Sequence, residues 1–572
     1  MSTHRTPLAL AAASLALASL SFGAPQAATL RVTSTADSGP GSLRAALASA
    51  ADGDTVDARS VAGTILLTSG PLVVSTSVVI VGPGSVVLAV SGDDGSGVFE
   101  ITANDVTLRG LGVTEGSSTS SGAGIKIGSL AGSTIQLEAC AITANHTSQH
   151  GAGIYNASGV SLSIVDCDLY ANGANGFGGA IYNDNGTILI STSSLRANGA
   201  DLGGAIFNGG GTTFGIVQLF RCTLSGNSAN YGGGVYNLGA SPGDATLTLE
   251  SCTVSGNSAG GAGAIYNDGA WGGLAELEIN ACTFSANTSA NGSIVNDGRF
   301  NGVAELDLAD SIFATTAPGV TLENQAGQLR SLGHNLSSDD QSSLLSHASD
   351  RVLLDPLLGP LQDHGGLGFT HELLPGSPAI DAGNRAIFGG ALTEDQRGLP
   401  RTFDDPSITN ASGSDGSDIG AFEVSPSAEI SKPQAKLSFS KANADRCSFS
   451  AALDLGPAFE PSGQELRVDF AGATLALTFD EKGKGATERG AIPSGRAKLK
   501  LEKRTGLWTL SVDLKSGSWS SAWAARGLTN DDVPKPGTPV TVPILVRIGE
   551  RGWASELSLH YTAKAGKSGT AK

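Results

Sequence analysis

Short stretches in which apolar and polar residues alternate recur through the first half of the chain. Each lies beside a Cys or Ser residue that returns at intervals of 26 to 30 residues, and this residue marks one repeat. Alternation with a period of two is the pattern of a strand that buries one face. The markers are Cys140, Cys167, Ser193, Cys222, Cys252, Cys282 and Ser311.

Three columns of aliphatic residues keep fixed distances from the markers. Three short strands in each repeat, each with one buried column, predict one turn of a right-handed parallel β-helix, because parallel crossovers are right-handed. Leucine-rich repeats have a similar length, but their Leu-x-x-Leu-x-Leu pattern is absent from the sequence. The columns are Ile135/Leu137, Leu162/Ile164, Ile188/Ile190, Val217/Leu219, Leu247/Leu249, Leu277/Ile279 and Leu306/Leu308, then Ile142, Leu169, Leu195, Leu224, Val254, Phe284 and Phe313, then Ile154, Ile181, Ile206, Val235, Ile265 and Ile294.

Polar and aromatic residues repeat with the same spacing. An Asn follows most markers by five residues, and a second Asn ends a later Ile-Tyr-Asn segment or its variant. Asn side chains hydrogen-bond along a column and aromatic rings stack, so we expect two Asn ladders and one aromatic stack. They comprise Asn145, Asn172, Asn198, Asn227, Asn257 and Asn287, then Asn156, Asn183, Asn208, Asn237, Asn267 and Asn296, then Tyr155, Tyr182, Phe207, Tyr236 and Tyr266.

Several of these motifs resemble known families of exported proteins. The segments Gly178–Ile181 and Phe284–Asn287 resemble the GGAI and FxxN repeats of chlamydial polymorphic outer-membrane proteins. Thr33–Val56 is similar to the N-terminal segment of bacterial secreted β-helix proteins of the CSLREA type. Gly376–Gly383, with Gln396-Arg397-Gly398-Leu399-Pro400-Arg401 and Asp418–Glu423, resembles the choice-of-anchor Q domain. The resemblance implies an exported or cell-surface protein, in a family mostly without known enzymatic activity.

The repeats and the changes in composition divide the chain into seven expected segments. Ser42 is expected to cap a short helix with Leu43, Ala46 and Leu47 on its buried face, which would close the N-terminal end of the stack. The segments are a signal peptide at 1–28, an N-terminal cap with the first strand at 29–60, a parallel β-helix at 61–330, its C-terminal cap at 331–424, a linker at 425–436, an antiparallel β-sandwich at 437–563 and a basic tail at 564–572.

Alternating apolar residues return after the linker. Residues 540–548 form the longest such run, and Pro543 within it indicates an edge strand. Strands of this length between Gly, Asp and Lys turns predict a small antiparallel sandwich. Four tryptophans lie here, and we favour packing in the core for them over stacking on carbohydrate. They are Trp508, Trp519, Trp523 and Trp553.

Composition and charge exclude several classes of protein. Of 572 residues 79 are Gly, without the strict period of collagen, and a mean hydropathy of +0.05 is too apolar for a disordered chain. Residues 1–429 carry a net charge of −25, so they repel nucleic acid, whereas residues 430–572 carry +7. The apolar run 8–20 follows Arg5 and is too short to cross a membrane, which is typical of a signal peptide. No later segment has the length of a transmembrane helix.

Candidate catalytic residues are few. Asp268 and Asp297 take equivalent places in adjacent repeats, where two carboxylates would suit a glycoside hydrolase, but both follow Asn and precede Gly, as in ordinary turns. We favour the turn. His364 and His371 lie near Asp363 and Glu372, and without a third ligand their spacing is weak support for a zinc site.

Two further columns carry chemistry. The five Cys markers are expected to be buried thiols, since Ser replaces Cys twice, although adjacent rungs are close enough for disulfides. The strands Ala275–Ile279 and Ala304–Leu308 align one rung apart, so their acidic residues share one outer face. We expect either a solvated acidic face or, as the alternative, a calcium site. Its ligands would be Glu276, Glu278, Glu305 and Asp307.

The sequence therefore favours an all-β protein that is secreted or displayed on the cell surface, with the periplasm as another compartment. We expect it to act by binding a carbohydrate or cell-surface ligand, as an adhesin-like or envelope-associated protein without catalysis. The alternative is a polysaccharide lyase or glycoside hydrolase that uses a groove along the β-helix. A purely structural surface component is the third hypothesis.

Overall fold

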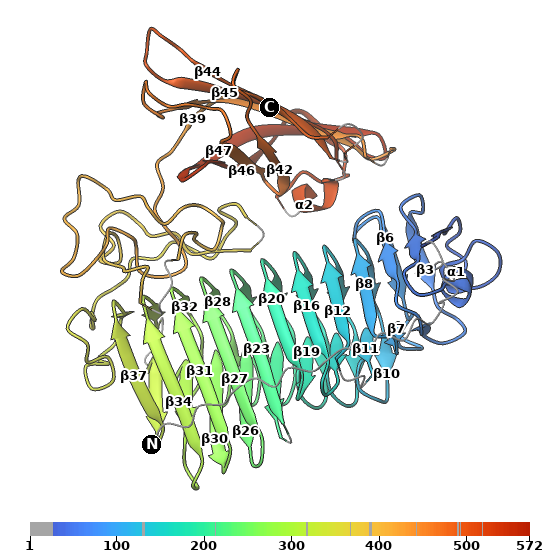
Figure 1. Ribbon diagram of the computed structural model, residues 1–572, viewed down its shortest axis with the longest axis vertical. Helices are drawn as coiled ribbons and strands as arrows, with labels where there is room; N and C mark the ends of the chain where they lie inside the picture. Colours follow the sequence, from blue (N-terminus) through green and yellow to red (C-terminus); the bar gives the residue numbers. More distant parts are fainter. Residues whose placement is uncertain are drawn as a thin grey trace, which may run out of the picture.

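The computed structural model describes residues 27–128, 132–211, 213–315, 319–366, 368–387, 392–441, 443–488, 491, 493–517, 519–524 and 526–572. The expected signal peptide at 1–28 lies outside these residues except for its last two positions. The described chain is all-β: a parallel β-solenoid with three sheets, an irregular segment that covers part of it, and a separate antiparallel domain (Figure 1).

The solenoid is built from the short strands that the repeats predict. Sheet A faces the viewer in Figure 1 and contains, in the described residues, β1 (Thr29–Arg31), β2 (Thr55–Asp57), β5 (Val79–Val81), β8 (Asp105–Arg109), β12 (Thr134–Glu138), β16 (Ser161–Val165), β20 (Thr187–Ser191), β23 (Phe214–Phe220), β27 (Asp244–Glu250), β31 (Leu274–Asn280), β34 (Val303–Ala309) and β37 (Gln328–Gly333).

The other two long sheets are parallel throughout. Sheet B contains β3 (Gly63–Leu66), β6 (Leu88–Ser91), β9 (Gly112–Thr114), β13 (Ala141–Thr143), β17 (Asp168–Tyr170), β21 (Ser194–Arg196), β24 (Thr223–Ser225), β28 (Thr253–Ser255), β32 (Thr283–Ser285), β35 (Ile312–Ala314) and β38 (Leu336–Ser337). Sheet C contains β4 (Leu72–Val74), β7 (Phe99–Ile101), β11 (Ile125–Ile127), β15 (Ile154–Asn156), β19 (Ile181–Asp184), β22 (Ile206–Gly210), β26 (Val235–Ala240), β30 (Ile265–Trp271), β33 (Ile294–Asp297) and β36 (Leu322–Gln325).

Short additional strands and one helix complete the solenoid. Helix α1 (Leu43–Ser49) lies at its N-terminal end, and the Ser42 side chain accepts a hydrogen bond from the backbone N–H of Ala45 at 3.2 Å, as expected for the cap. Leu43, Ala46 and Leu47 are buried, which confirms the predicted face. The additional strands are β10 (Ser117–Ser118), β14 (His146–Thr147), β18 (Gly173–Ala174), β25 (Ser228–Ala229) and β29 (Ser258–Ala259).

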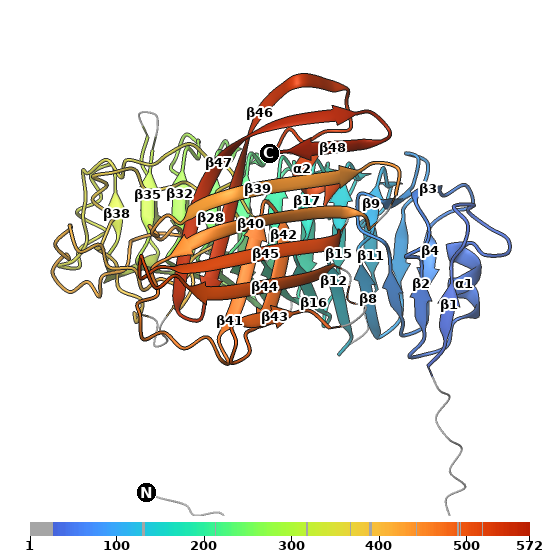
Figure 2. The same ribbon diagram turned by 90° about the horizontal axis from the view of Figure 1, so that it is seen from above.

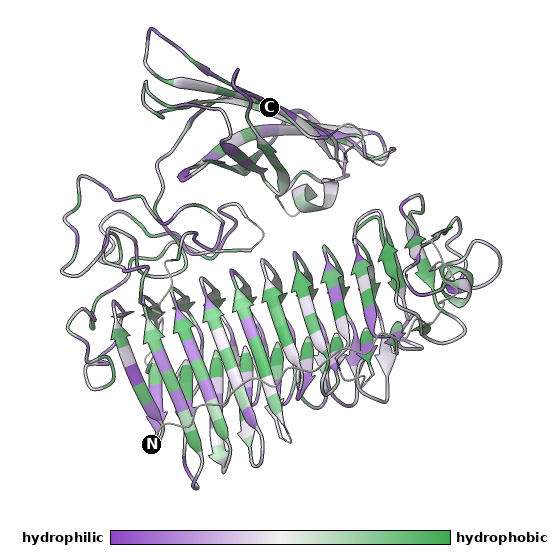
Figure 3. Cartoon of the chain, viewed as in Figure 1, coloured by the Kyte–Doolittle hydropathy of each residue, from purple (hydrophilic) through white to green (hydrophobic). Residues whose placement is uncertain are grey.

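The aliphatic columns are confirmed residue by residue. Leu247, Leu277 and Leu306 are neighbours in the parallel register of sheet A, and all three are almost completely buried. The same sheet alternates hydrophobic and hydrophilic bands in Figure 3. Inward-facing side chains of all three sheets form one continuous core that runs along the solenoid. The driving force is apolar burial, which each rung completes only against its neighbours.

Both Asn ladders are present and buried. Asn172 accepts from the side-chain Nδ2 of Asn145 at 2.9 Å and also from its backbone N–H, and in turn donates to Asn198. The second ladder continues one rung further than expected, because Asn296 donates to Asn324 at 2.9 Å. Amides inside each ladder both donate and accept, so these buried polar groups are satisfied by their own column. At the start of the second ladder Asn156 donates to Asn183, but its Oδ1 atom has no hydrogen-bond partner in the described residues.

The marker column has a function that its residue types alone did not indicate. The Sγ atoms of Cys167 and Cys252 accept the backbone N–H of the preceding markers, Cys140 and Cys222, at 3.4 and 3.3 Å. Ser193 does the same for Cys167 through Oγ at 3.1 Å. All six Cys residues are buried free thiols, as predicted for the column. Ser can replace Cys here because both are small acceptors.

Every corner before a marker uses a left-handed backbone. Ala139, Asp166, Thr192, Arg221 and Ser251 have φ between 46° and 56°. Such φ values are uncommon outside Gly and Asn, so residue type gave no hint of this corner. The side chains at these corners lie outside the core cluster, and at Arg221 and Asp310 they form ion pairs with the covering segment described below.

The expected aromatic stack lies on the outer side of sheet C. Neighbouring rings of Tyr155, Tyr182, Phe207, Tyr236 and Tyr266 lie 5.1 to 5.7 Å apart with interplanar angles of 6° or 7°. Phe207, Tyr236 and Tyr266 are buried beneath the loops that lead into sheet C. The stack is therefore part of the packing.

An irregular segment after β38 covers the C-terminal part of sheet B. Its contacts fall on one outward row of Thr residues: the amide of Gln396 bonds to Thr223 and Thr253, and Thr283 accepts the backbone N–H of Ala421 at 3.0 Å. Arg401 is completely buried between this segment and the solenoid, where it pairs with Asp310. We call residues 338–428 the covering segment.

The C-terminal domain is one antiparallel sheet of ten described strands that curls into a near-barrel around its own core. It lies over the middle rungs of the solenoid (Figure 2). Its elements are β39 (Glu429–Ser438), β40 (Asp445–Leu453), β41 (Glu465–Phe470), β42 (Ala473–Thr478), β43 (Lys484–Ala486), β44 (Ser494–Leu501), β45 (Trp508–Gly517), α2 (Ser520–Ala524), β46 (Val533–Ile548), β47 (Arg551–Lys564) and β48 (Ser568–Ala571).

Three expectations for this domain differ from the structure. Strand β46 lies between β41 and β47, so it is not an edge strand; Pro543 is tolerated because pairing with β41 begins only at Ile544. Strand β39 begins inside the expected linker at 425–436. Strand β48 lies inside the expected basic tail at 564–572 and pairs with β39 and β47, because its small residues fit between these strands. The four tryptophans are buried, as predicted.

Candidate functional site

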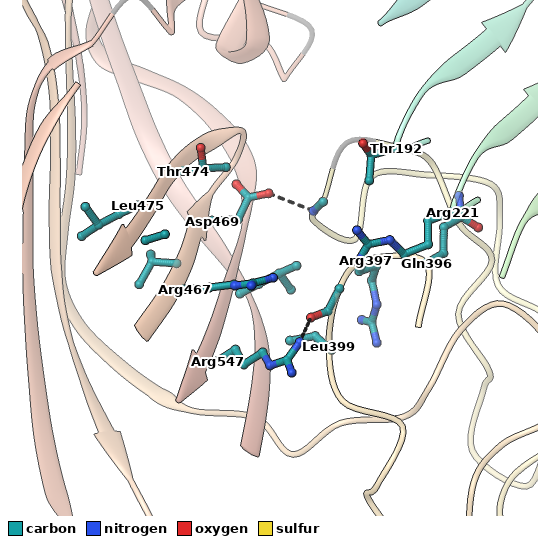
Figure 4. A pocket seen from close by; sticks show the side chains of 15 residues that line it. Thr192, Arg221, Gln396, Arg397, Leu399, Arg467, Asp469, Thr474, Leu475 and Arg547 are labelled. Carbon is teal, nitrogen blue, oxygen red and sulfur yellow. Dashed lines mark hydrogen bonds between the residues drawn. The ribbon is translucent and has the colours of Figure 1, made fainter. Parts of the chain in front are cut away.

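A cavity of about 290 Å³ lies where the solenoid, the covering segment and the C-terminal domain meet (Figure 4). The solenoid contributes Thr192 and Arg221 from two neighbouring corners. The covering segment contributes the turn that contains Arg397 and Leu399. Strands β41, β42 and β46 of the C-terminal domain supply the remaining wall.

Glu394 holds three arginines at this cavity. Its two carboxylate oxygens form ion pairs with Arg221 of the solenoid and Arg547 of β46, and the guanidinium of Arg467 lies 3.7 Å away. Arg547 is also a hydrogen-bond donor to the Gly398 carbonyl at 3.3 Å. These partners lie 153 and 173 residues from Glu394 in sequence, so the cluster fixes the three parts of the chain against one another.

Arg467 is the arginine at the cavity with the most exposed side chain, at 53%, against 27% for Arg221 and 14% for Arg547. Its Nε donates to Glu465 at 2.9 Å. Arg397, by contrast, is paired with Asp395 and stacks on the ring of Phe422 at 3.6 Å. Arg467 therefore offers the more accessible guanidinium to a ligand.

Asp469 lines the same cavity, and both of its oxygens accept hydrogen bonds from the backbone. Gly366 donates to Oδ2 at 2.9 Å, and Gly472 donates to Oδ1. Burial raises the pKa of Asp469 to about 6, although these bonds oppose the shift. The carboxylate thus anchors the covering segment to the C-terminal domain.

The acidic residues expected to share one outer face do so. Glu276 pairs in register with Glu305, and Glu278 with Asp307. Burial, followed by the charge of Asp307, raises the pKa of Glu278. The next strand supplies the positive charge that these two strands lack, because Arg330 forms an ion pair with Asp307.

The described side chains on this face are not arranged as the ligands of a calcium ion. In the part of the chain that the structure describes, no three His, Cys, Asp or Glu side chains are grouped so that they could hold a metal ion. A calcium ion bound to Glu276, Glu278, Glu305 and Asp307 would also compete with Arg330. The acidic face and its one arginine fit the solvated interpretation better.

The carboxylates considered for hydrolysis are occupied by their own surroundings. Asp268 and Asp297 are adjacent in register and buried, and they accept hydrogen bonds from the hydroxyls of Tyr236 and Tyr266. Burial raises the pKa of Asp268. At Asp297 burial is outweighed by the bonds from Arg299 and Tyr266, so its pKa is lowered. These contacts support the interpretation of both residues as structural.

The histidines hold the covering segment together. His371 bonds to Ser255 of β28 at 2.9 Å and to the Gly359 carbonyl at 2.7 Å, and burial lowers its pKa. Burial and the charge of Arg397 lower the pKa of His364 to about 4, and its ring contacts Gln362 and Thr370. Both rings are thus neutral packing elements at pH 7.

Sheet B carries one more charged group, on rungs before those that the covering segment contacts. Asp168 on β17 forms an ion pair with Arg196 on β21, and the guanidinium lies 4.2 Å from the centre of the Tyr170 ring. Burial raises the pKa of Asp168. Hydrogen bonds from the covering segment to this sheet fall on Thr223 and later rungs, away from this row.

Sequence reasoning did not single out Glu394, Arg467 or Arg547. Nothing in their spacing connects them, and only the excess of positive charge after residue 430 indicated a basic surface.

Among the described residues no helix is long and apolar enough to cross a membrane. The chain matches no family model, and the searches of curated proteins and of solved structures found no match either.

Proposed function

We propose that the protein is exported and acts outside the cytoplasm by binding a ligand, as an adhesin-like or envelope-associated β-helix protein without catalysis. The cavity between the three parts of the chain supports this proposal. It combines the exposed guanidinium of Arg467 with the apolar residues Leu399 and Leu545, and a few polar groups set beside apolar ones are the features of a site that orients a ligand. The signal-like pattern of residues 1–28 and the resemblance to polymorphic outer-membrane and choice-of-anchor Q proteins support the location at the cell surface or in the medium.

Binding is favoured over turnover because the carboxylates beside the cavity have other partners. Glu394 is held by arginines, and Asp469 accepts two backbone hydrogen bonds. A general acid or base must exchange a proton with its substrate from a position within hydrogen-bond reach. Neither carboxylate is free to do so in this arrangement.

A carbohydrate-active enzyme is the second candidate, and Asp168 favours it. This carboxyl has a raised pKa, and its partner Arg196 also lies over the Tyr170 ring, so protonation of Asp168 would release a guanidinium beside an aromatic surface. A carboxyl that keeps its proton closer to neutral pH suits a general acid. The groove would then follow sheet B.

One experiment separates the two candidates. Purified full-length protein is applied to a glycan array, and every bound glycan is then incubated with the protein and assayed for new reducing ends and for unsaturated products. Retention without product supports binding, whereas product that disappears in the D168N variant supports the enzyme. Failure to retain any glycan, together with failure to adhere to cell surfaces, would contradict the proposal.

A further inference from the structure

We infer that the outer face of the C-terminal domain binds an acidic polysaccharide, with sugar carboxylates between Lys484 and Lys498 and sugar hydroxyl groups over a neighbouring row of serines. This inference rests on the proposed binding function and places a ligand at a surface other than the cavity. Strands β39, β40, β45 and β44 form this face on the side of the domain away from the solenoid, with β43 at its edge (Figures 1 and 2).

One row of side chains crosses five neighbouring strands of this face. Lys484 on β43 pairs in register with Lys498 on β44, which pairs with Ser511 on β45. Ser511 pairs in turn with Ser450 on β40, and Ser450 with Ser431 on β39. Their chain neighbours on β40, β44 and β45 are buried in the core of the domain, so the row faces outward. It presents two ammonium groups beside three hydroxyl groups.

The stretch of chain that forms β43, β44 and β45 is positively charged when every acidic residue is counted. Residues 480–517 hold nine basic and five acidic side chains, which is a net charge of +4. Two acidic residues of this stretch form ion pairs, and their partners are other basic residues than the two lysines of the row. These pairs are Asp513 with Arg496 and Lys515, and Glu502 with Lys500.

Lys484 and Lys498 form no ion pair in the part of the chain that the structure describes. Asp480, in the turn before β43, accepts the backbone N–H groups of Lys482 and Lys484, each at 2.8 Å. Its carboxylate is therefore engaged by the turn. Like charges directly opposite each other destabilise a sheet, so an anion placed between Lys484 and Lys498 relieves a repulsion.

The hydroxyl half of the row distinguishes a sugar polymer from other polyanions. Polyphosphate uses the ammonium groups alone, whereas sugar hydroxyls also donate to and accept from Ser511 and Ser450, whose own hydroxyls lie 3.3 Å apart. Single-stranded nucleic acids stack on aromatic side chains, and membrane-surface segments insert apolar ones. Among the described residues, the exposed large apolar side chains all lie at or before Leu374, so this domain offers neither.

The shape and the position of the face also suit a polyanion. A hollow of about 610 Å³ lies along the row, lined by Lys484, Lys498 and Ser511 together with Arg496 and the carboxylates of Asp480 and Asp513. Residues 1–429, which carry a net charge of −25, lie on the opposite side of the domain. A polyanion that approaches the outer face is therefore repelled least.

The test uses the full chain and a carboxylate-bearing oligosaccharide. Isothermal titration calorimetry with hexagalacturonate should give binding that weakens as salt is added. K484Q/K498Q should weaken this binding by about tenfold, because it removes both ammonium groups. The matched control is K564Q/K567Q, which removes the same charge from exposed positions beside the turn between β47 and β48 and should change the affinity by less than about twofold.

A second pair of variants separates a sugar from a charge. S450A/S511A should weaken hexagalacturonate by about threefold and leave the binding of polyphosphate, which has charge alone, unchanged. Equal losses in K484Q/K498Q and K564Q/K567Q would indicate general attraction of polyanions and would overturn the inference. Equal binding of polyphosphate and hexagalacturonate with no effect of S450A/S511A would overturn it too, as would preferential binding of phosphatidylglycerol vesicles.

Self-association of the chain is the remaining occupant of this face, and light scattering measures it. Oligomers that K484Q/K498Q abolishes, without any binding of hexagalacturonate, would overturn the inference in favour of a second copy. If neutral glycans bind and K484Q/K498Q has no effect on them, the inference fails while the proposed function stands. Retention of no glycan and no adhesion to cell surfaces would refute both.

Discussion

Replacing Asn237 by Ala should destabilise the rungs around it far more than an exposed Asn would. Asn237 is completely buried; it accepts from Asn208 and donates to Asn267, each at 2.7 Å, and donates to the Glu276 carbonyl at 3.1 Å. Ala leaves the Oδ1 atom of Asn267 without this donor. A buried polar group that loses its partner costs about 1–3 kcal/mol, and the vacated volume adds to this. We expect a local destabilisation of about 3 kcal/mol.

Hydrogen exchange read by mass spectrometry is the appropriate assay, because a solenoid opens by neighbouring rungs and has no single unfolding free energy. Peptides from β22, β26 and β30 should exchange about a hundredfold faster in N237A, as about 1.4 kcal/mol corresponds to a factor of ten. Peptides from β5 and β8 should be unaffected. The control is N175A, which removes an exposed side chain two rungs away. Equal exchange in N237A and N175A would refute the view that the ladder stabilises the stack.

Three further predictions concern other columns and the covering segment. Burial, followed by the charge of Asp418, raises the pKa of Glu423, so the stabilising contribution of this carboxyl is full at low pH and is lost as the pH rises. The melting temperature should therefore fall less between pH 5 and pH 8 in E423Q than in the unaltered protein. An equal fall in both proteins would contradict this prediction. C252S should cost less than about 1 kcal/mol of local stability, because Ser311 already accepts from Cys282 in the same way. C252V loses the acceptor and should cost about 2 kcal/mol more, read from hydrogen exchange of peptides from β24 and β28; equal losses would refute the acceptor function. At the acidic face, R330Q removes the cation that would compete with calcium, so calcium should raise the melting temperature of R330Q. The triple variant R330Q/E276Q/E305Q should show no such rise. Identical melting curves of R330Q with calcium and with a chelator would refute the calcium hypothesis.

The repeated part of the fold could be predicted from the sequence almost completely. Its columns depend on one short-range rule, the alternation of side chains along a strand, and the same rule applies in each turn of the solenoid. Leu277 is buried for the same reason as Leu247 and Leu306, so each rung provides an independent check on the others. The Asn and aromatic columns follow by the same logic. The left-handed corners could not be predicted in this way, because the residues that occupy them, among them Ala, Asp, Thr and Arg, share no side-chain property.

The candidate site could not be predicted because no local pattern describes it. Arg221, Glu394 and Arg547 belong to three parts of the chain, and only the return of the covering segment over sheet B brings them together. Pro543 shows a related limit. Proline is compatible with an internal strand where the neighbouring strand has ended, and that depends on the register between β41 and β46. Such information lies in long-range pairing.

The same hydrogen bond is repeated between the marker residues of successive rungs. This repetition determines how the chain can gain or lose length. Cys167 accepts the N–H of Cys140 and donates its own to Ser193, so this rung presents to its successor the same group that it accepts from its predecessor. The same bond joins Cys222, Cys252, Cys282 and Ser311 in turn. A duplicated turn inserted between two such rungs would find donors and acceptors in place on both sides. Genetic gain or loss of a whole turn is therefore a mild change, whereas gain of half a turn would shift every column off the core. The covering segment sets the limit, because Gln396 must still reach Thr223 and Thr253, and growth is thus easiest on the N-terminal side of these rungs.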